Sequence, residues 1–315
     1  MDEPLAAWVA ATLGTSPRDV FFTRASMSSV WGVELEDGRR VAVKVRSDGS
    51  RLAIASHAQE VARASGIDCP RILIGPTLIR GTPHRWLTVE EWRGEGVIDP
   101  PGDPVAHYAT LLAAINAALR ADPSPSLTPP PWLDYDHGHV GRTWPPAASD
   151  QWDPHRIESD LPPDLPRLAQ LARARLLRAS LPRFLVHGDL NPANVRWVQS
   201  GGSVTPLVHD WDSVAFVSEA VVAGEVAADL LQKPGDERLA DVPTCARFLA
   251  AFGEARGRAL SPEEAEVAWA TTAWLGAYNA AFEHLHGRPG AVSQQILADG
   301  DERLRLAGAD GPAAR

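Results

Sequence analysis

The chain has 315 residues, of which 44% are hydrophobic and 22% are charged. This length predicts about two domains or lobes, and the composition predicts packed cores and excludes a chain that is disordered throughout. The formal net charge of −10 argues against general binding of nucleic acid or of an anionic membrane surface. It is compatible with a cationic substrate.

Cysteine usage and apolar runs bear on location. Cys69 and Cys245 lie far apart without the spacing of a metal site, which favours a reduced, cytoplasmic compartment. The acidic start has no apolar segment of a secretory signal. The longest uncharged run, residues 267–282, is shorter than the roughly 20 apolar residues that a membrane span needs, and it predicts a buried helix. We therefore expect a cytoplasmic protein without a membrane partner.

The N-terminal part of the sequence carries mainly strand signals. Apolar periodicity predicts a short amphipathic helix over residues 3–13, ending at Gly14. Of the three strands that follow, the second and third are joined by a tight Asp37-Gly38 turn. The elements expected after the first helix are strands 20–22, 30–35 and 41–45, a helix over 50–65, strands 71–74 and 86–92, and a linker at 93–96.

Lys44 is unusual in the third of these strands. Lys44 and Lys233 are the only lysines, and every other basic side chain apart from histidine is an arginine. Alternation along the strand places Lys44 on the face opposite Val43 and Val45. A chain that prefers arginine this strongly yet keeps a lysine inside an apolar strand indicates a function for an ammonium group there. The alternative is an edge lysine whose stem covers apolar surface.

The rest of the chain is predicted to be mainly helical. The clearest helix start is Ser261-Pro262-Glu263-Glu264, a capping box with proline at the first helical position. Residues 122–166 show no periodicity and form either a binding loop that shapes an acceptor pocket or a packed surface loop. The residues that would shape such a pocket are Trp132, Asp134, Tyr135, Asp136, His137, Trp144 and Trp152. The expected helices are 103–120, 165–180, 219–231, 242–256, 262–286 and 292–306.

Two polar segments interrupt this part, each at the end of an apolar, strand-like run. The first polar loop, residues 187–194, reads His-Gly-Asp-Leu-Asn-Pro-Ala-Asn, and the second polar loop, residues 209–212, reads His-Asp-Trp-Asp. A hairpin signal with a Gly-Gly turn lies between them. Because a tight turn returns the second strand alongside the first, we expect Asp189, Asn194 and Asp210 to meet at one rim.

An aspartate, an asparagine five residues later and a further aspartate after a short hairpin suit phosphoryl transfer. One carboxylate takes up the proton of the acceptor hydroxyl, while an amide oxygen and the second carboxylate hold the magnesium that bridges the nucleotide phosphates. The order His-x-Asp-x-x-x-x-Asn followed by Asp is that of kinase catalytic and metal loops. With Gly188 after the histidine and Asp-Trp-Asp in the second loop, the pair resembles the aminoglycoside phosphotransferase and choline kinase family.

This resemblance implies an α+β, protein-kinase-like fold of two lobes. The N-terminal lobe, residues 1–93, would hold an antiparallel sheet and a helix, and the larger lobe, residues 94–315, would be mainly helical. The implied activity is transfer of the γ-phosphoryl group of ATP or GTP to a hydroxyl of a small acceptor, with Mg²⁺. Asp189 is then the catalytic base, and Asn194 and Asp210 hold the metal.

The resemblance also implies roles around the nucleotide. Lys44 would contact the α- and β-phosphates, and Glu60, the only acid of the helix after that strand, would pair with Lys44. Ser28, in a polar turn without glycine, would lie over the phosphates. Backbone groups from Glu90 to Trp92 would meet the adenine edge, and Trp92 lines the nucleotide pocket or belongs to the core.

Three further side chains are expected to support the loops. His187 would prop the first polar loop through hydrogen bonds, and Asn191 would hydrogen-bond within it. Asp212 either assists the metal or caps the turn that follows. Acids on the later helices, such as Glu225, Asp229 and Glu283, either meet a polyamine acceptor or belong to solvated helix faces.

The resemblance leaves the acceptor open. It allows aminoglycosides, other antibiotics, choline-like alcohols, sugars and amino-alcohols, among which the acidity of the chain favours a cationic one. Antibiotic resistance and metabolism are both compatible with the sequence, and so are ATP and GTP. The oligomeric state is not determined by the sequence.

Two rival functions are consistent with parts of the pattern. A metal-dependent hydrolase could use His187, Asp189, His209 and Asp210 as ligands, because His-x-Asp and His-Asp both suit divalent ions. It leaves Lys44 and the order of the elements unexplained. A non-catalytic relative that binds a nucleotide or a partner is the second rival, although all the essential polar residues are in place.

Overall fold

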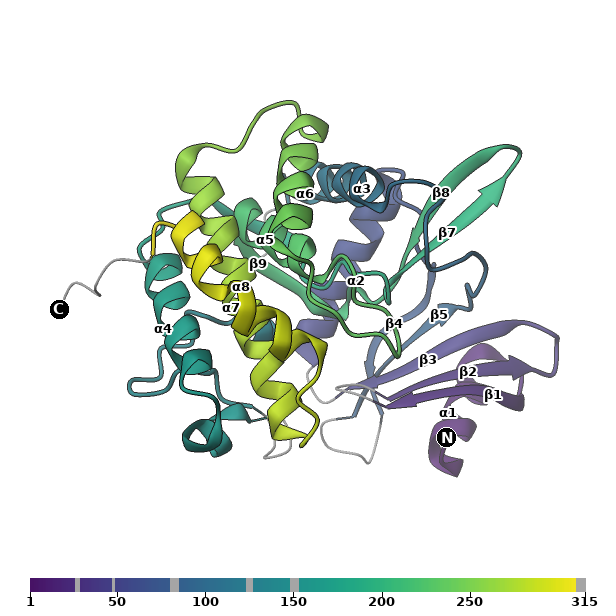
Figure 1. Cartoon of the computed structure of the whole chain (residues 1–315). Helices are drawn as coiled ribbons and strands as arrows, with labels where there is room; N and C mark the ends of the chain where they lie inside the picture. Colours follow the sequence, from purple (N-terminus) through teal and green to yellow (C-terminus); the bar gives the residue numbers. More distant parts are fainter. Residues whose placement is uncertain (26–28, 47–48, 80–84, 123–126, 148–152, 310–315) are drawn as a thin grey trace. The chain divides into compact units, whose positions relative to one another are not determined.

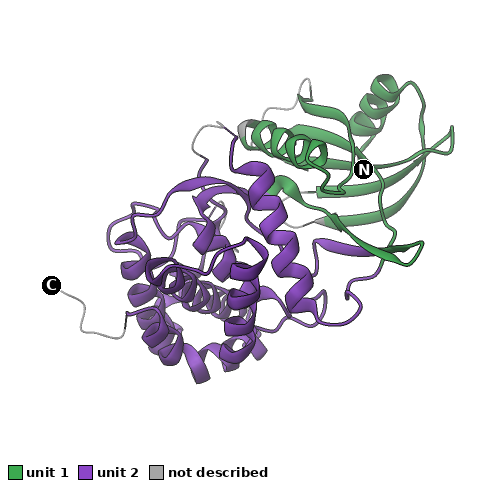
Figure 2. Ribbon diagram, turned by 90° about the horizontal axis from the view of Figure 1, so that it is seen from above, with its two compact units in different colours: residues 1–96, 198–212 green, residues 97–197, 213–315 purple. Residues whose placement is uncertain are grey.

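The computed structural model describes residues 1–25, 29–46, 49–79, 85–122, 127–147 and 153–309. The chain divides into two compact units (Figure 2). The first unit consists of Met1–Gly96 and Val198–Asp212, and the second of Val97–Trp197 and Ser213–Arg315. The second polar loop therefore belongs to the first unit, whereas the sequence had placed it with the larger lobe.

The first unit is built on a five-stranded antiparallel sheet of order β1-β2-β3-β5-β4. Its helices are α1 (Glu3–Leu13) and α2 (Gly49–Ala64), and α2 packs on β4 and β5 (Figure 1). The predicted strands and helices of this part are confirmed, with some ends shifted by a few residues. The strands are β1 (Pro17–Ala25), β2 (Ser29–Leu35), β3 (Arg40–Arg46), β4 (Ile72–Leu78) and β5 (Trp86–Glu91).

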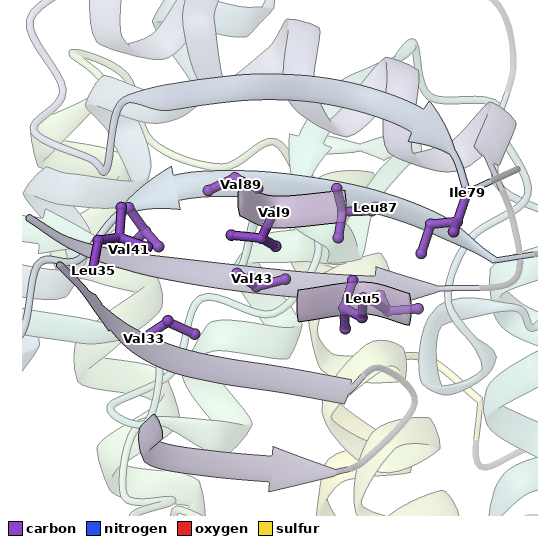
Figure 3. Close-up of a cluster of buried hydrophobic side chains, with 10 residues drawn as sticks. Leu5, Val9, Val33, Leu35, Val41, Val43, Ile79, Leu87 and Val89 are labelled. Carbon is purple, nitrogen blue, oxygen red and sulfur yellow. The ribbon is translucent and has the colours of Figure 1, made fainter. Parts of the chain in front are cut away.

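Helix α1 covers one face of this sheet. The Asp2 side chain caps it by accepting from the Leu5 N–H, and it ends at Gly14, whose φ is +73°. Leu5 and Val9, four residues apart on one helix face, lie over the sheet in Figure 3. The buried strand residues of this core are Val33, Leu35, Val41, Val43, Val45, Ile79, Leu87 and Val89. Because alternate residues of β3 fill this core, Lys44 lies on the other face, as predicted.

The second unit is mainly helical, and all six predicted helices are confirmed. Its longest helix, α7, begins with the predicted capping box and packs against α4, α5 and α8. The helices are α3 (Pro104–Leu119), α4 (Asp164–Leu177), α5 (Glu219–Asp229), α6 (Val242–Ala255), α7 (Pro262–Leu285) and α8 (Ala291–Leu306), with short 3-10 helices η1 (Pro131–Leu133) and η3 (Pro154–Asp160). A further 3-10 helix, η4 (Trp211–Ser213), lies at the boundary between the two units. No helix within the described ranges is long and apolar enough to cross a membrane.

Two pairs of strands frame the polar loops. β7 (Val195–Ser200) and β8 (Ser203–Val208) form the predicted hairpin, with Gly201 and Gly202 at positive φ in its turn. β6 (Arg183–His187) pairs antiparallel with β9 (Val214–Ser218). The sequence did not predict β9, because its short apolar run leads directly into α5 without a turn signal.

The described part of residues 122–166 is largely packed. The Trp144 side chain is fully buried, and its ring centroid lies 5.9 Å from that of Trp274 and 6.2 Å from that of Tyr278. Tyr135 is also buried. For these residues the packed surface loop is the correct alternative.

The contact between α5 and α7 depends on a glycine. A Cβ added to Gly224 would lie 2.2 Å from the Ala268 carbonyl oxygen and 2.8 Å from Thr271 Cβ. Because the obstacle is backbone, Gly224→Ala should destabilise the protein by about 2 kcal/mol despite the better helix propensity of alanine. We expect the Tm to fall by roughly 5 °C in thermal denaturation.

Gly300→Ala is the matched control. A Cβ at Gly300 of α8 would also be too close to its neighbour, but that neighbour is the flexible end of Leu168. Its Tm should therefore fall clearly less than that of Gly224→Ala. Equal Tm values for the two variants would show that α5 and α7 do not pack as closely as described.

Candidate functional site

The first polar loop holds the Asp189 carboxylate by both oxygens. The Asn191 side-chain amide donates to Asp189 Oδ1 at 2.6 Å, and the Asn194 amide donates to Asp189 Oδ2 at 2.8 Å and to the Asp189 carbonyl oxygen at 2.9 Å. The carboxylate is therefore fixed before any ligand binds. Because the Asn194 amide is planar and its nitrogen faces Asp189, its oxygen lies on the side away from Asp189.

Hydrogen bonds and close packing also fix the backbone of the first polar loop. His187 is fully buried, and its Nδ1 accepts from the Asp189 N–H at 3.3 Å, a contact within the first polar loop. Asn191 Oδ1 accepts from the Ala193 N–H at 2.9 Å, which confirms hydrogen bonding within the loop. A Cβ on Gly188 would lie 2.6 Å from the Ser213 carbonyl oxygen, so a larger residue does not fit at this position.

Trp132 connects the irregular segment to the loop. Its indole Nε1 donates to the Gly188 carbonyl oxygen at 2.8 Å, and its own carbonyl oxygen accepts from Trp274 Nε1 at 2.8 Å. Trp132 is partly exposed, and the carbonyl that it contacts lies one residue before Asp189. Sequence reasoning had grouped Trp132 with several other candidates, because nothing local distinguished it from the buried Trp144.

Two further acids lie near Asp189 within the second unit. Glu225 and Asp229 are four residues apart on α5, hence on one face, and both are buried. Neither carboxylate oxygen of Glu225 has a hydrogen-bond partner among the described residues. Burial raises the pKa of both acids well above the usual values, and the charge of Asp189 adds to the effect. Glu283, by contrast, accepts hydrogen bonds from Gly290 and Ser293 at the start of α8.

In the first unit Lys44 is paired with Glu90 of β5. Lys44 Nζ lies 3.1 Å from Glu90 Oε2, and both side chains are buried. Burial by itself lowers the pKa of Lys44, but the carboxylates of Glu90, Asp212 and Asp210 outweigh it and raise that pKa above its ordinary value. The ammonium therefore stays charged. A charged ammonium is suited to pair with phosphate oxygens.

The prediction that Glu60 pairs with Lys44 was wrong. Glu60 lies on α2 and pairs with Arg63 at 3.1 Å, with 42% of its side chain exposed. It lies outside the buried stripe of α2, which includes Leu52 and Ala55. Glu90 lies opposite Ala42 in the strand pairing and so shares the face of Lys44. This placement depends on the register between β3 and β5, which the sequence does not show.

The second polar loop has an unusual backbone and a buried acid. Asp210 has φ of +57°, a conformation that residues other than glycine rarely adopt. Asp212 Oδ2 lies 2.5 Å from Arg46 Nε, and the Asp212 carbonyl oxygen accepts from Arg51 at 3.3 Å. Burial raises the pKa of Asp212, but Lys44 and Arg46 outweigh it and lower that pKa, so the carboxylate is ionised. Sequence reasoning missed both arginines.

The expected contacts to the adenine edge are partly used within the first unit. The Glu91 N–H donates to the Arg71 carbonyl oxygen at 2.9 Å, and the Trp92 N–H donates to the Arg40 carbonyl oxygen at 3.0 Å. The Trp92 ring packs on the Phe21 and Phe22 rings of β1, at centroid distances of 4.8 and 5.3 Å. Ser28, expected over the phosphates, lies outside the described residues.

The expected metal ligands suit Mg²⁺ better than they suit the metal of a hydrolase. Mg²⁺ prefers oxygen ligands from one or two protein groups together with phosphates and water, and the expected ligands Asn194 and Asp210 would supply an amide oxygen and a carboxylate. The hydrolase alternative needs a cluster of His and Asp side chains around the metal. Within the described residues no group of three or more His, Cys, Asp or Glu side chains is arranged to hold a metal.

The sequence matches the model of the phosphotransferase enzyme family over residues 24–216, more than half of the chain. The chain belongs to this family. No curated protein matches the sequence. The family membership identifies a phosphotransferase, and the α+β fold is the protein-kinase-like fold of its structural neighbours.

Three solved structures illustrate this similarity of fold. The amicoumacin kinase hAmiN, solved with AMP-PNP and Ca²⁺, has a TM-score of 0.65 and 13% identity, and the match covers 98% of this chain and 94% of that one. An aminoglycoside phosphotransferase from Alicyclobacillus acidocaldarius has a TM-score of 0.55 and 18% identity, with 95% and 93% covered. A microcompartment-associated aminopropanol kinase has a TM-score of 0.58 and 15% identity, with 97% and 100% covered.

The pairing of Lys44 can be tested by truncating each acid. Glu90→Ala leaves a buried ammonium without its closest partner, which should cost about 3–5 kcal/mol and lower the Tm strongly. Glu60→Ala removes only an exposed pair worth at most about 0.5 kcal/mol. Thermal denaturation of the two variants decides whether Glu90 or Glu60 is the partner of Lys44. A larger loss of Tm for Glu60→Ala would mean that α2 supplies the carboxylate.

Proposed function

We propose that the protein is a small-molecule kinase that transfers the γ-phosphoryl group of ATP or GTP to a hydroxyl of a small acceptor. The observation that carries the proposal is the geometry of Asp189. Both oxygens of its carboxylate are held by the amides of Asn191 and Asn194 in a loop of His-Gly-Asp type. A carboxylate fixed in this way is prepared to orient a hydroxyl group and to accept its proton.

The other residues are assigned by their chemistry. Lys44, kept charged by its acidic neighbours, binds the α- and β-phosphates, while Asn194 and Asp210 hold Mg²⁺. When bound, the metal neutralises the charge that develops on the phosphates. As the acceptor oxygen bonds to the γ-phosphorus, its proton passes to Asp189 and the bond to the β-phosphate oxygen breaks, releasing the nucleoside diphosphate.

We further propose that the acceptor carries an ammonium group. Asp189, Glu225 and Asp229 place three acids close together in the second unit, and Glu225 has no hydrogen-bond partner among the described residues. A cation bound beside Asp189 is attracted by this cluster and favours its ionised form. The net charge of −10 agrees with this choice. One of the similar structures is named as an aminopropanol kinase, whose acceptor is an amino-alcohol.

The first test is binding of nucleotide and metal. ATP or GTP with Mg²⁺, at about a hundred times its dissociation constant, should stabilise the wild type by roughly 2.7 kcal/mol in thermal melts. Asp210→Ala should lose the part of this stabilisation that depends on Mg²⁺. Asp189→Asn should keep it, because Asp189 is assigned to the acceptor, yet lose about 10²–10⁴-fold in turnover with any acceptor found by screening with labelled nucleotide.

The contrary result for this test is specific. If neither nucleotide raises the Tm while Zn²⁺ or Mn²⁺ alone does, the kinase assignment fails and the hydrolase takes its place. If nucleotide binds but no acceptor is phosphorylated in a screen of antibiotics, sugars and amino-alcohols, the non-catalytic alternative is favoured.

The second test addresses the acceptor. Amino-alcohols should be phosphorylated with higher kcat/KM than neutral alcohols of the same skeleton, and Glu225→Gln should reduce this preference about tenfold, the equivalent of one charge-assisted contact of about 1.4 kcal/mol. Because burial raises the pKa of Glu225, its ionisation costs stability as the pH rises above about 4.5, so Glu225→Gln should also raise the Tm of the free protein most at alkaline pH.

Glu254→Gln is the matched control for this variant. Glu254 is an exposed acid of α6, so the same change of charge there should leave both the amine preference and the pH dependence of the Tm unaltered. An equal loss of amine preference in both variants would mean that the preference comes from the net charge of the protein and not from the position of Glu225. Unchanged preference in Glu225→Gln would remove the proposed role of the acid cluster.

A further inference from the structure

Asp212 of the second polar loop is held by two arginines from separate elements. Arg46 ends β3 and Arg51 lies in the first turn of α2. The Arg46 guanidinium forms an ion pair with the Asp212 carboxylate at 2.5 Å, with only 10% and 5% of the two side chains exposed. Arg51 donates to the Asp212 backbone carbonyl oxygen at 3.3 Å. Arg46 thus pairs with the side chain of Asp212, and Arg51 holds its backbone.

This arrangement makes Asp212 a poor metal ligand. Its carboxylate is buried against a guanidinium, and Lys44 adds a second positive charge nearby. A divalent cation would have to displace Arg46 and leave that buried charge without a partner, which is costly. Of the two alternatives for Asp212, assistance to the metal is therefore the weaker one.

Asp210, two residues earlier, needs such support. Its φ of +57° is strained for a residue with a side chain, at a cost of roughly 1–3 kcal/mol. A strained conformation persists only when its surroundings hold it. One side of this turn is held by Trp211, whose buried indole donates to the Val208 carbonyl oxygen at 3.2 Å. The other side is held through Asp212 by Arg46 and Arg51.

We propose that Arg46 and Arg51 are positioning residues that hold the second polar loop, through Asp212, in the backbone conformation in which Asp210 binds Mg²⁺. The inference rests on the proposed function and deepens it. Arg46 lies two residues after Lys44 and on the same face of β3. The strand that supplies the phosphate-binding ammonium thereby also anchors the loop that supplies the metal ligand.

The test compares Arg46→Gln, Arg46→Lys and Arg51→Gln with Arg40→Gln. Arg40 begins the same strand but forms an exposed pair with Glu34, so its removal should change nothing. Removing a residue that supports a metal ligand typically weakens metal affinity about 10–100-fold. We expect Arg46→Gln to weaken Mn²⁺ binding at least tenfold in the presence of AMP-PNP, measured by electron paramagnetic resonance, with partial recovery in Arg46→Lys.

A kinetic readout separates positioning from loss of structure. In Arg46→Gln the Mg²⁺ concentration for half-maximal rate should rise by a similar factor, while kcat recovers at saturating Mg²⁺. Binding of ADP without metal should be unchanged. The double variant Arg46→Gln/Asp212→Asn should be no worse than either single change, because both break one contact.

Each contrary outcome has its own meaning. If Arg46→Gln and Arg51→Gln bind Mn²⁺ as tightly as Arg40→Gln does, the inference fails although the kinase can stand. If ADP without metal is weakened equally, Arg46 binds phosphate directly. If the Asp212→Asn and Arg46→Gln effects add, Asp212 is itself a ligand. If the wild type binds no metal–nucleotide complex, the proposed function fails first.

Discussion

The buried charge of Lys44 is the constraint on which the first unit is built. An ammonium on a strand whose other face fills the core cannot stay charged without nearby carboxylates, since burial alone would remove its proton. Glu90 supplies the direct partner, while Asp210 and Asp212 add negative potential. Two acids beyond the direct partner then need a counter-charge of their own. Arg46 meets that need at Asp212.

In the second unit the Asp189 carboxylate is held in a different way from the charged groups of the first unit. Asp189 is held by neutral amides, which fix its direction and leave its charge in place. No arginine occupies the position after His187, because the Ser213 carbonyl oxygen leaves room only for glycine there. With no guanidinium in the loop, the charge of Asp189 acts on Glu225 and Asp229 and, together with their burial, raises the pKa of both acids. A cationic acceptor, as proposed, would balance the charge of Asp189, and this would link the sequence of the loop to the chemistry of the acceptor.

The two polar loops, the Lys44 strand and the helices were predictable because their signals are local. A capping box, a Gly-Gly turn and apolar periodicity each lie within a few residues. Glu90 was not assigned to Lys44, because its place depends on the register of two strands about 45 residues apart in sequence. β9 was missed for the same reason, since a short apolar run is defined as a strand only by its pairing with β6. Trp132 and Trp144 carry the same local signal, and only packing separates them.

The roles assigned to the acids follow from what surrounds each one. A buried carboxylate beside a guanidinium, like that of Asp212, has its negative charge balanced by that guanidinium and serves as an anchor. One held by amides, like that of Asp189, keeps its charge and a defined direction, which is what a general base requires. A buried carboxylate without a hydrogen-bond partner among the described residues, like that of Glu225, favours a bound cation or a proton. Sequence motifs count all of these as acids in a kinase-like pattern. Their partners decide which of them anchors, reacts or recognises.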